Sequence, residues 1–136
     1  MTEQCIFCKI VNKEIPADII YEDDKIVAFL DIHPVSRGHL LVIPKNHTND
    51  ILETDDATAA DMIHKSKKLA DAVVKAVNAD GFTISTNNGL AAGQTVFHLH
   101  FHLIPRFSND NLPPWPHHEI EPKTRAEIAE RIRKQL

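Results

Sequence analysis

The sequence lacks the features that would place the chain in a membrane or on a nucleic acid. It has no apolar run near the roughly 18 residues that a bilayer-spanning helix requires, and Met1–Lys9 shows no basic segment followed by an apolar one. The formal net charge is −4, so no basic surface for a polyanion is predicted. We therefore expect a cytoplasmic protein that binds neither a membrane nor a nucleic acid.

Cysteine is also scarce, since the chain has only Cys5 and Cys8 in a Cys-x-x-Cys pair. In a reducing compartment such a pair indicates a metal or redox site before a structural disulfide. A thioredoxin-like role fits less well, because no βαβ pattern surrounds the pair. Two thiolates supply half of a tetrahedral zinc site, and two reduced, half-buried packing residues are the alternative.

Internal repeats, low-complexity tracts and long linkers are absent from the 136 residues, which favours one domain. Only Asn109–Pro122 departs in composition, with four prolines around Trp115. Proline fixes φ and lacks a backbone donor, so this stretch is predicted to be an extended arm. We expect residues 1–108 to form the main unit, and residues 109–136 to add an arm and a C-terminal helix to the same domain or to a dimer.

Hydrophobic periodicity predicts an α+β domain on an antiparallel sheet. An amphipathic helix is expected between Asp55 and Val77, capped by Thr54 or Asp55, and a second near Thr124, which has capping-box spacing to Glu127. Five strands are expected. They are Ile19–Tyr21, Ile26–Leu30, Leu40–Pro44, Phe82–Asn87 and Val96–Ile104.

The last of these strands carries the chemistry. His98, His100 and His102 alternate with apolar residues, so a period of two places the three imidazoles on one face. The alternative is a row of histidines on a solvated sheet face. A glycine-containing turn, Asn87–Thr95, comes just before and can direct backbone donors at an anion, and His39 opens another strand. Imidazoles suit a phosphate site because one can attack phosphorus while others donate to its oxygens, and no carboxylate cluster supplies a magnesium site.

Several ordered blocks resemble the histidine triad superfamily, in its nucleotide-binding, Hint-like branch. The segment 98–104, HLHFHLI, has the alternating signature of that family, and 92–96, AGQTV, resembles the segment before it. Further blocks from Cys5 to about Phe107 agree. They are CIFCKI at 5–10, IPA at 15–17, AFLDI at 28–32 and GHLLVIPK at 38–45.

The resemblance implies a role for each matching residue. His100 is the nucleophile and forms a nucleotidyl-histidine, His102 and Gln94 contact the phosphate, and Thr95, where this branch often has serine, assists the leaving group. His39 and His98 support and orient the site, Asn87 contacts the sugar-phosphate region, and Asp31 binds the ribose hydroxyls. The base lies among Ile6, Phe7, Ile10, Phe29 and Ile32.

Two of these assignments keep an alternative from the residues themselves. Asp31 precedes Pro34 in a turn-like stretch and can cap a turn instead, and the apolar group can be plain core packing. Some members of the superfamily complete a zinc site with two histidines, which here are His47 and His98 beside Cys5 and Cys8. His33, His64, His117 and His118 fit no constellation and are expected on the surface.

The sequence thus predicts a purine nucleotide hydrolase or nucleotidyl transferase, with phosphoramidates or related phosphate esters as substrates. No cofactor is expected for the chemistry, and zinc is the one structural ion considered. The resemblance implies a five-stranded antiparallel sheet with two helices, joined to a second sheet in a homodimer. The alternatives are a dinucleoside polyphosphate hydrolase, a nucleotide-binding adaptor with incidental turnover, and a zinc-binding structural protein.

Overall fold

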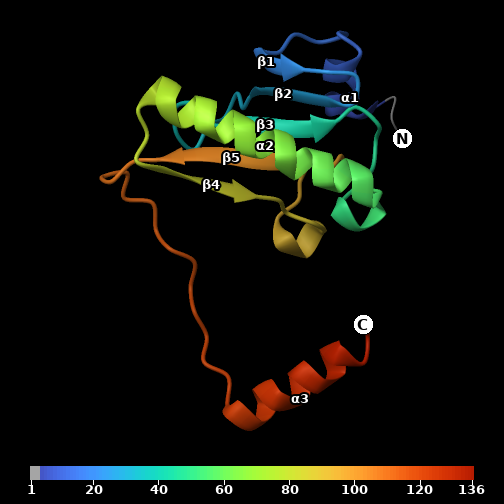
Figure 1. Ribbon diagram of the computed structural model, residues 1–136, viewed down its shortest axis with the longest axis vertical. Helices are drawn as coiled ribbons and strands as arrows, with labels where there is room; N and C mark the ends of the chain where they lie inside the picture. The colour runs from blue at the N-terminus through green and yellow to red at the C-terminus, as the bar shows by residue number, and fades with distance from the viewer. Residues whose placement is uncertain (1–3) are drawn as a thin grey trace.

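One antiparallel sheet of five strands is the centre of the computed structural model, which describes residues 4–136 (Figure 1). The strands lie in the order β1-β2-β3-β5-β4, so β1 and β4 form the two edges. This confirms the predicted α+β fold. Their bounds are Ile19–Glu22 for β1, Ile26–Leu30 for β2, Leu40–Pro44 for β3, Gly81–Ser85 for β4 and Phe101–Arg106 for β5.

The fifth strand begins later than its alternation predicts. The alternating pattern predicts that residues 98–100 belong to the strand, but β5 starts at Phe101. The backbone of Leu99 donates to the Thr48 carbonyl at 2.8 Å, so this segment pairs with the loop after β3 and has no ladder partner there. The expected alternation still holds: Leu99, Phe101 and Leu103 lie in one core cluster, while His98, His100 and His102 are outside it.

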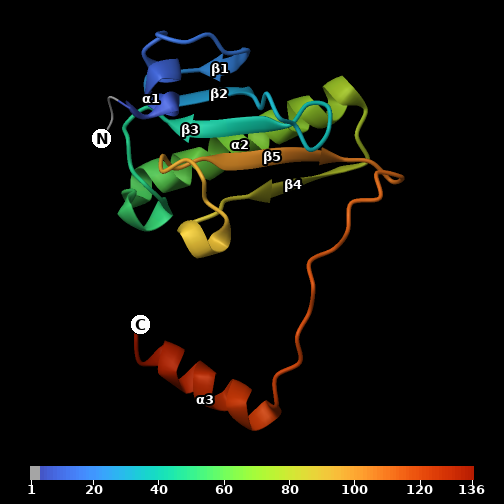
Figure 2. The same cartoon turned by 180° about the vertical axis from the view of Figure 1, so that it is seen from behind.

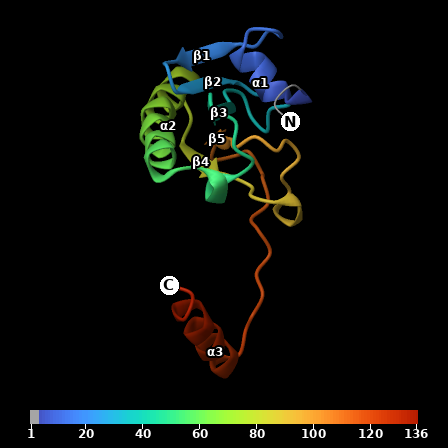
Figure 3. The same cartoon turned by 90° about the vertical axis from the view of Figure 1, so that its right-hand side faces the viewer.

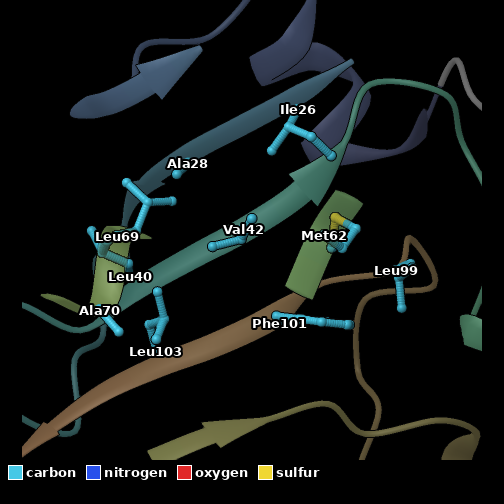
Figure 4. Packing of buried hydrophobic residues seen from close by; sticks show 10 residues of the cluster. All are labelled: Ile26, Ala28, Leu40, Val42, Met62, Leu69, Ala70, Leu99, Phe101 and Leu103. Atoms are coloured by element: carbon cyan, nitrogen blue, oxygen red, sulfur yellow. The ribbon is translucent and has the colours of Figure 1, made fainter. Parts of the chain in front are cut away.

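Helix α2, Asp56–Val77, covers one face of the sheet and forms the larger core with it (Figure 4). It has the predicted extent, because the Asp55 side chain accepts from Thr58 N–H at its start and Asn78 takes a left-handed φ of 56° at its end. Met62, Leu69 and Ala70 pack on β2, β3 and β5, and each large buried side chain contributes about 1.5 to 3 kcal/mol.

A short helix, α1, lies on the opposite face, which gives three layers (Figure 3). It spans Ile6–Val11, is capped by Cys5 and buries Phe7, Cys8 and Ile10. The expected count of two helices omitted it, because six residues are too few to show a helical period. α1 packs on the outward side chains of β2 and β3, and the pocket described below lies on this face.

The C-terminal segment leaves the sheet as an extended arm, as predicted, and ends in α3, Pro122–Arg133 (Figure 2). The expected capping box at Thr124 and Glu127 is wrong. α3 starts two residues earlier, with Pro122 in its first turn, and has no side-chain cap. No residue of α3 is buried.

Across residues 4–136, no helix has both the length and the apolarity that crossing a bilayer requires.

Candidate functional site

A pocket of about 460 Å³ opens between α1, the end of β2 and the start of β5. Nine of the predicted site residues line it, and they come from four separate parts of the sequence. These are Ile6, Phe7, Ile10, Phe29, Asp31, Ile32, Thr95, His100 and His102. The sheet face that carries α1 therefore brings together most of the residues that the sequence singles out.

His100 presents an unprotonated nitrogen in this pocket. Its Nδ1 lies 2.8 Å from the His98 carbonyl oxygen. A carbonyl can only accept, so Nδ1 carries the proton and Nε2 keeps its lone pair. Phe7 lies edge-on to the imidazole at a centroid distance of 5.2 Å and restricts its orientation. His100 thus has the tautomer that a nitrogen nucleophile requires.

His102 carries its proton on Nε2, the opposite ring nitrogen from that of His100, and its contact with His39 determines this. The Val35 N–H donates to His39 Nδ1 at 3.0 Å, so the proton of a neutral His39 is on Nε2. That nitrogen lies 3.0 Å from His102 Nδ1 and donates to it. His102 consequently carries its own proton on Nε2 and is a hydrogen-bond donor for an oxygen in the pocket.

The backbone conformation of Gly38 allows His39 to lie in this position. It adopts φ of 92°, and a Cβ there would lie 3.1 Å from Val77 and 3.3 Å from Pro105. Only glycine meets both demands without strain. The loop before β3 is thereby held close to the end of α2 with His39 turned inward, where it is buried.

The site imidazoles are held neutral. Burial lowers the pKa of His98 and of His102 to about 4, and it lowers the pKa of His39 and His100 from the ordinary value. In each case the dominant cause is the loss of hydration of the charged ring. The rings are therefore available at neutral pH as nucleophile, acceptor or neutral donor.

Asp31 lines the pocket and also serves its own turn. One carboxylate oxygen accepts the His33 N–H at 2.9 Å, and the other lies 3.6 Å from His39 Nε2. Asp31 therefore does cap its turn, as the alternative interpretation predicted. The position of the carboxylate in the pocket wall is also compatible with the predicted ribose contact, which stays a prediction.

The apolar wall is partly core and partly open. Phe7, Ile10 and Phe29 are buried and pack with β2 and β3, so they serve the core and the wall together. Ile6 and Ile32 are 47% and 78% exposed and belong to the wall without being core. His33, expected on the surface outside any constellation, lines the pocket too, as does the Ile15–Ala17 segment.

Gln94 and Asn87 lie differently from the other predicted residues, because neither lines the pocket. Gln94 is buried, and its amide accepts from Gly89 N–H and donates to the carbonyls of Asn49 and Val96. The Asn87 amide lies beside Gly93. In this geometry Gln94 fixes the loop that carries Thr95, and direct phosphate contact by either residue remains a prediction.

The four predicted metal ligands converge behind the pocket. The Sγ atoms of Cys5 and Cys8 and ring nitrogens of His47 and His98 lie within 4.8 Å of one another. The distance from Cys5 Sγ to His98 Nδ1 is 3.4 Å, and Cys8 Sγ lies 3.3 Å from His47 Nδ1 and 3.5 Å from His98 Nδ1. Tetrahedral zinc with ordinary bond lengths places sulfur and nitrogen about 3.5 Å apart, so the cluster has the right size.

The outer nitrogens of the two histidines are occupied in the way that zinc ligands require. His98 Nε2 donates to the Pro44 carbonyl at 2.8 Å, and His47 Nε2 donates to the Asn49 side-chain oxygen at 3.3 Å. Both Nδ1 lone pairs therefore face the thiols. Burial raises the pKa of Cys8 to about 11, so a thiolate there needs a cation. The donor set fits zinc.

A second group, Asp31, His39 and His102, is also compact but is poorly suited to a metal. The Val35 N–H holds the His39 proton on Nε2, the atom that would have to bind the ion. Metal binding would leave two donors, Val35 N–H and His39 Nδ1–H, facing each other.

Comparison with known proteins gives a consistent result. Residues 12–109 match the HIT domain. An uncharacterized HIT-like protein of Methanocaldococcus jannaschii is 49% identical over 106 residues, which are 78% of this chain and 81% of that protein. Adenylylsulfatase HINT3 of Arabidopsis thaliana is 44% identical over 112 residues, 82% of this chain and 57% of that protein.

Solved structures agree in fold over nearly the whole chain. A Streptococcus mutans protein has a TM-score of 0.91 at 44% identity, covering 97% of this chain and 85% of that one. A histidine triad nucleotide-binding protein from Candida albicans has a TM-score of 0.85 at 33% identity, covering 97% and 96%. A zinc-bound histidine triad family protein from Mycobacterium smegmatis has a TM-score of 0.80 at 39% identity, covering 96% and 99%.

Proposed function

The chain belongs to the HIT domain family, and from this premise we propose that it is a nucleotide hydrolase or nucleotidyl transferase that cleaves purine nucleoside phosphoramidates or related phosphate esters. The observation that carries the proposal is the hydrogen bond that places the proton of neutral His100 on Nδ1. Its Nδ1 donates to the His98 carbonyl at 2.8 Å while the ring lines the pocket. A lone pair is thus directed from a fixed ring into a space of nucleotide size.

The first half of the reaction forms a covalent intermediate. His100 Nε2 attacks the α-phosphorus, the new N–P bond forms, and the bond from phosphorus to the leaving nitrogen or oxygen breaks. The leaving group takes up a proton from water, directly or through the Thr95 hydroxyl, and departs. His100 gains positive charge in this step, and the His98 carbonyl that accepts its Nδ1–H stabilises that charge.

The second half releases the nucleotide. Water, or another acceptor in a transfer reaction, attacks phosphorus and loses a proton to solvent, and the bond to Nε2 breaks to restore neutral His100. His102 donates Nε2–H to a nonbridging oxygen in both halves, and His39 keeps that proton in place through His102 Nδ1. The Thr95 hydroxyl lies in the pocket wall, where it can donate to the leaving atom.

Substrate binding uses the rest of the pocket. The base packs among the apolar wall residues, and the free oxygen of Asp31 accepts from the ribose hydroxyls. Cys5, Cys8, His47 and His98 would hold a zinc ion, which would supply a structural cross-link. Four such ligands would complete the coordination of zinc and leave no position for a catalytic water, so the ion would be structural.

The names of relatives support a nucleotide substrate. The Candida albicans structure is called a nucleotide-binding protein, and the Arabidopsis relative an adenylylsulfatase. For this chain we extend that to hydrolysis of adenosine or guanosine phosphoramidates, in the cytoplasm, by a homodimer. Both cysteines are free thiols, which suits a reducing compartment. With a net charge of −4, a small nucleotide is a better partner than a nucleic acid.

The test is turnover of adenosine 5′-phosphoramidate by the wild-type protein and by two variants. His100→Ala should abolish hydrolysis and keep nucleotide affinity within about tenfold, because it removes the attacking atom but few contacts. His100→Gly should regain activity when free imidazole is added. His64→Ala, on the exposed face of α2, is the matched control and should keep full activity. Undiminished hydrolysis by His100→Ala would contradict the assignment of the nucleophile.

A further inference from the structure

The two cysteines of the cysteine–histidine cluster differ in how well a small molecule can reach them. Cys5 is partly exposed and lines a surface hollow of about 430 Å³ beside α1, whereas Cys8 is buried. A hollow of this volume admits molecules of the size of water or hydrogen peroxide. Cys5 Sγ is therefore the sulfur that a small reagent meets first.

The two sulfur atoms are also close enough to be joined. They lie within 4.8 Å of each other, and Cys5 Sγ accepts the Cys8 N–H at 3.4 Å across the first turn of α1. Residues three apart in a helical turn have Cα atoms about 5 Å from each other, inside the range of roughly 4.4 to 6.8 Å that a disulfide requires. A Cys5–Cys8 disulfide therefore needs rotation of the side chains and little movement of the backbone.

A disulfide between these residues is incompatible with the zinc site. Zinc binds sulfur as the thiolate, and the sulfurs of a disulfide carry no negative charge. Of the four candidate ligands, only His47 and His98 would remain after oxidation. Joining Cys5 to Cys8 would thus release the ion and remove the cross-link between α1 and the segment before β5.

His98 connects this cluster to the proposed nucleophile. Its Nδ1 lies 3.4 Å from Cys5 Sγ and 3.5 Å from Cys8 Sγ, and its backbone carbonyl accepts the His100 Nδ1–H at 2.8 Å. The same residue is therefore held by the cluster through its ring and orients His100 through its carbonyl. When the two sulfurs join, the ring of His98 loses that anchor, and the carbonyl orients His100 less firmly.

Resting on the proposed function, we propose that Cys5 and Cys8 are a modification site for hydrogen peroxide, and that their oxidation to a disulfide lowers catalysis through His98. The Cys5 thiolate attacks one peroxide oxygen, the O–O bond breaks, and a sulfenic acid forms as hydroxide leaves. The Cys8 thiolate then attacks Cys5 Sγ, the S–S bond forms, and a second hydroxide leaves. Both hydroxides take protons from solvent, so the pair loses two electrons and the peroxide is reduced to two waters.

The experiment treats reduced, zinc-loaded wild-type protein with hydrogen peroxide. Cys5 and Cys8 share the tryptic peptide 1–9, whose mass should fall by about 2 Da, the two hydrogens that disulfide formation removes. A chromogenic chelator should detect one zinc released per disulfide. The kcat for adenosine 5′-phosphoramidate should fall about two- to tenfold, the range that one hydrogen bond contributes, and KM should change by less than about twofold, because the pocket wall is unaltered. Dithiothreitol with zinc should restore the rate.

Two matched variants determine which sulfur reacts first. In Cys8→Ser the sulfenic acid at Cys5 has no partner, so its adduct with dimedone should accumulate. In Cys5→Ser the remaining thiol is buried, and its labelling should be slower by about tenfold or more, since oxidation follows the exposure of the sulfur. Faster labelling of Cys8 than of Cys5 would overturn the assignment of Cys5 as the attacking sulfur.

Failure of this proposal is distinguishable from failure of the proposed function. Reduced wild-type protein that does not hydrolyse the phosphoramidate would contradict the proposed function, and the mass and zinc measurements would still test the modification site. A peptide 1–9 that gains oxygen without losing two hydrogens would overturn the disulfide. A disulfide that forms with undiminished kcat would overturn the control of catalysis through His98.

Discussion

Hydrogen-bond partners, more than residue type, divide the roles among the histidines. His98 and His100 each donate to a backbone carbonyl, but through different ring atoms, so one turns Nδ1 to the thiols and the other turns Nε2 to the pocket. His102 instead accepts from His39. We therefore propose that the three histidines at a spacing of two act as a metal ligand, a nucleophile and a hydrogen-bond donor.

Asp31→Asn tests the ribose contact at this scale. The amide oxygen can still accept the His33 N–H, so the turn should survive while the charge is lost. We expect KM for ribonucleotide substrates to rise more than KM for their 2′-deoxy counterparts. A charged acceptor bond contributes about 1.5 to 3 kcal/mol, which corresponds to roughly tenfold or more. Steady-state kinetics on matched ribo and deoxy phosphoramidates measures the difference.

The control for this variant is Asp24→Asn, since Asp24 is exposed in the β1–β2 turn and outside the pocket. It should leave both substrates unchanged. Equal losses for the two sugars in Asp31→Asn would assign the carboxylate to the turn alone.

Elements with a clear period could be predicted from the sequence. Strands β2 and β3 begin and end where the apolar runs do, and α2 follows its 3.6-residue pattern between two caps. The start of β5 could not be predicted, because Leu99 pairs with Thr48, a contact fixed by the tertiary fold. Helix α1 has too few residues for a period, and its stability comes from packing Phe7 and Ile10 on the sheet.

The site residues could be predicted from the sequence only where the residue type itself indicates the chemistry. Histidines, paired cysteines and Asp31 are visible in the sequence, and the pocket and the neighbouring cysteine–histidine cluster together contain most of the predicted ones. The Val35 N–H that sets the His39 tautomer has no sequence signal, because any residue except proline supplies it. The buried bonds of Gln94 likewise depend on where two loops meet.

Zinc would connect elements that are distant in sequence. Its four ligands belong to the start of α1, the loop after β3 and the segment before β5. We expect about one zinc per chain in protein purified without chelator, because such sites bind with energies on the order of 10 kcal/mol. Removing it should lower Tm first and activity second, since the ion fixes the segment next to His100 but takes no part in the reaction.

Elemental analysis and thermal unfolding measure these effects, with Cys8→Ser as the variant and His64→Ala as the control outside the cluster. Less than about a tenth of an equivalent of zinc at neutral pH would contradict the site. Cys5 and Cys8 would then be reduced packing residues.

Among the described residues of one copy, apolar side chains on the arm and on α3 are exposed to solvent. α3 stands apart from the sheet in all three views (Figures 1–3), with Ile128 and Ile132 exposed on it. Trp115 on the arm is 82% exposed. An arm and a helix held out in this way have little to stabilise them in a monomer, so at this scale a second copy is the expected partner.

The edge strand β4 is where we expect the sheets of two copies to join. Its ladder with β5 runs without a register shift, and Phe82 on it is 48% exposed. The other edge, β1, has an irregularity between Ile19 and Tyr21, which discourages further pairing. A dimer that pairs β4 with its symmetry mate would convert two edges into the centre of one continuous sheet.

We therefore expect the protein to sediment as a dimer at micromolar concentration, and Phe82→Glu to shift it to monomer. The substitution would put a carboxylate on the edge strand of each copy, and like charges on adjacent paired strands destabilise strand pairing. Ile20→Glu is the matched control, because Ile20 is 50% exposed on the β1 edge and its substitution should leave the dimer intact.

Removing residues 109–136 should weaken the dimer without unfolding the sheet, since no residue of α3 belongs to its core. Analytical ultracentrifugation over a concentration series measures each case, and a wild-type monomer at micromolar concentration, or a Phe82→Glu dimer as tight as wild type, would contradict pairing through β4.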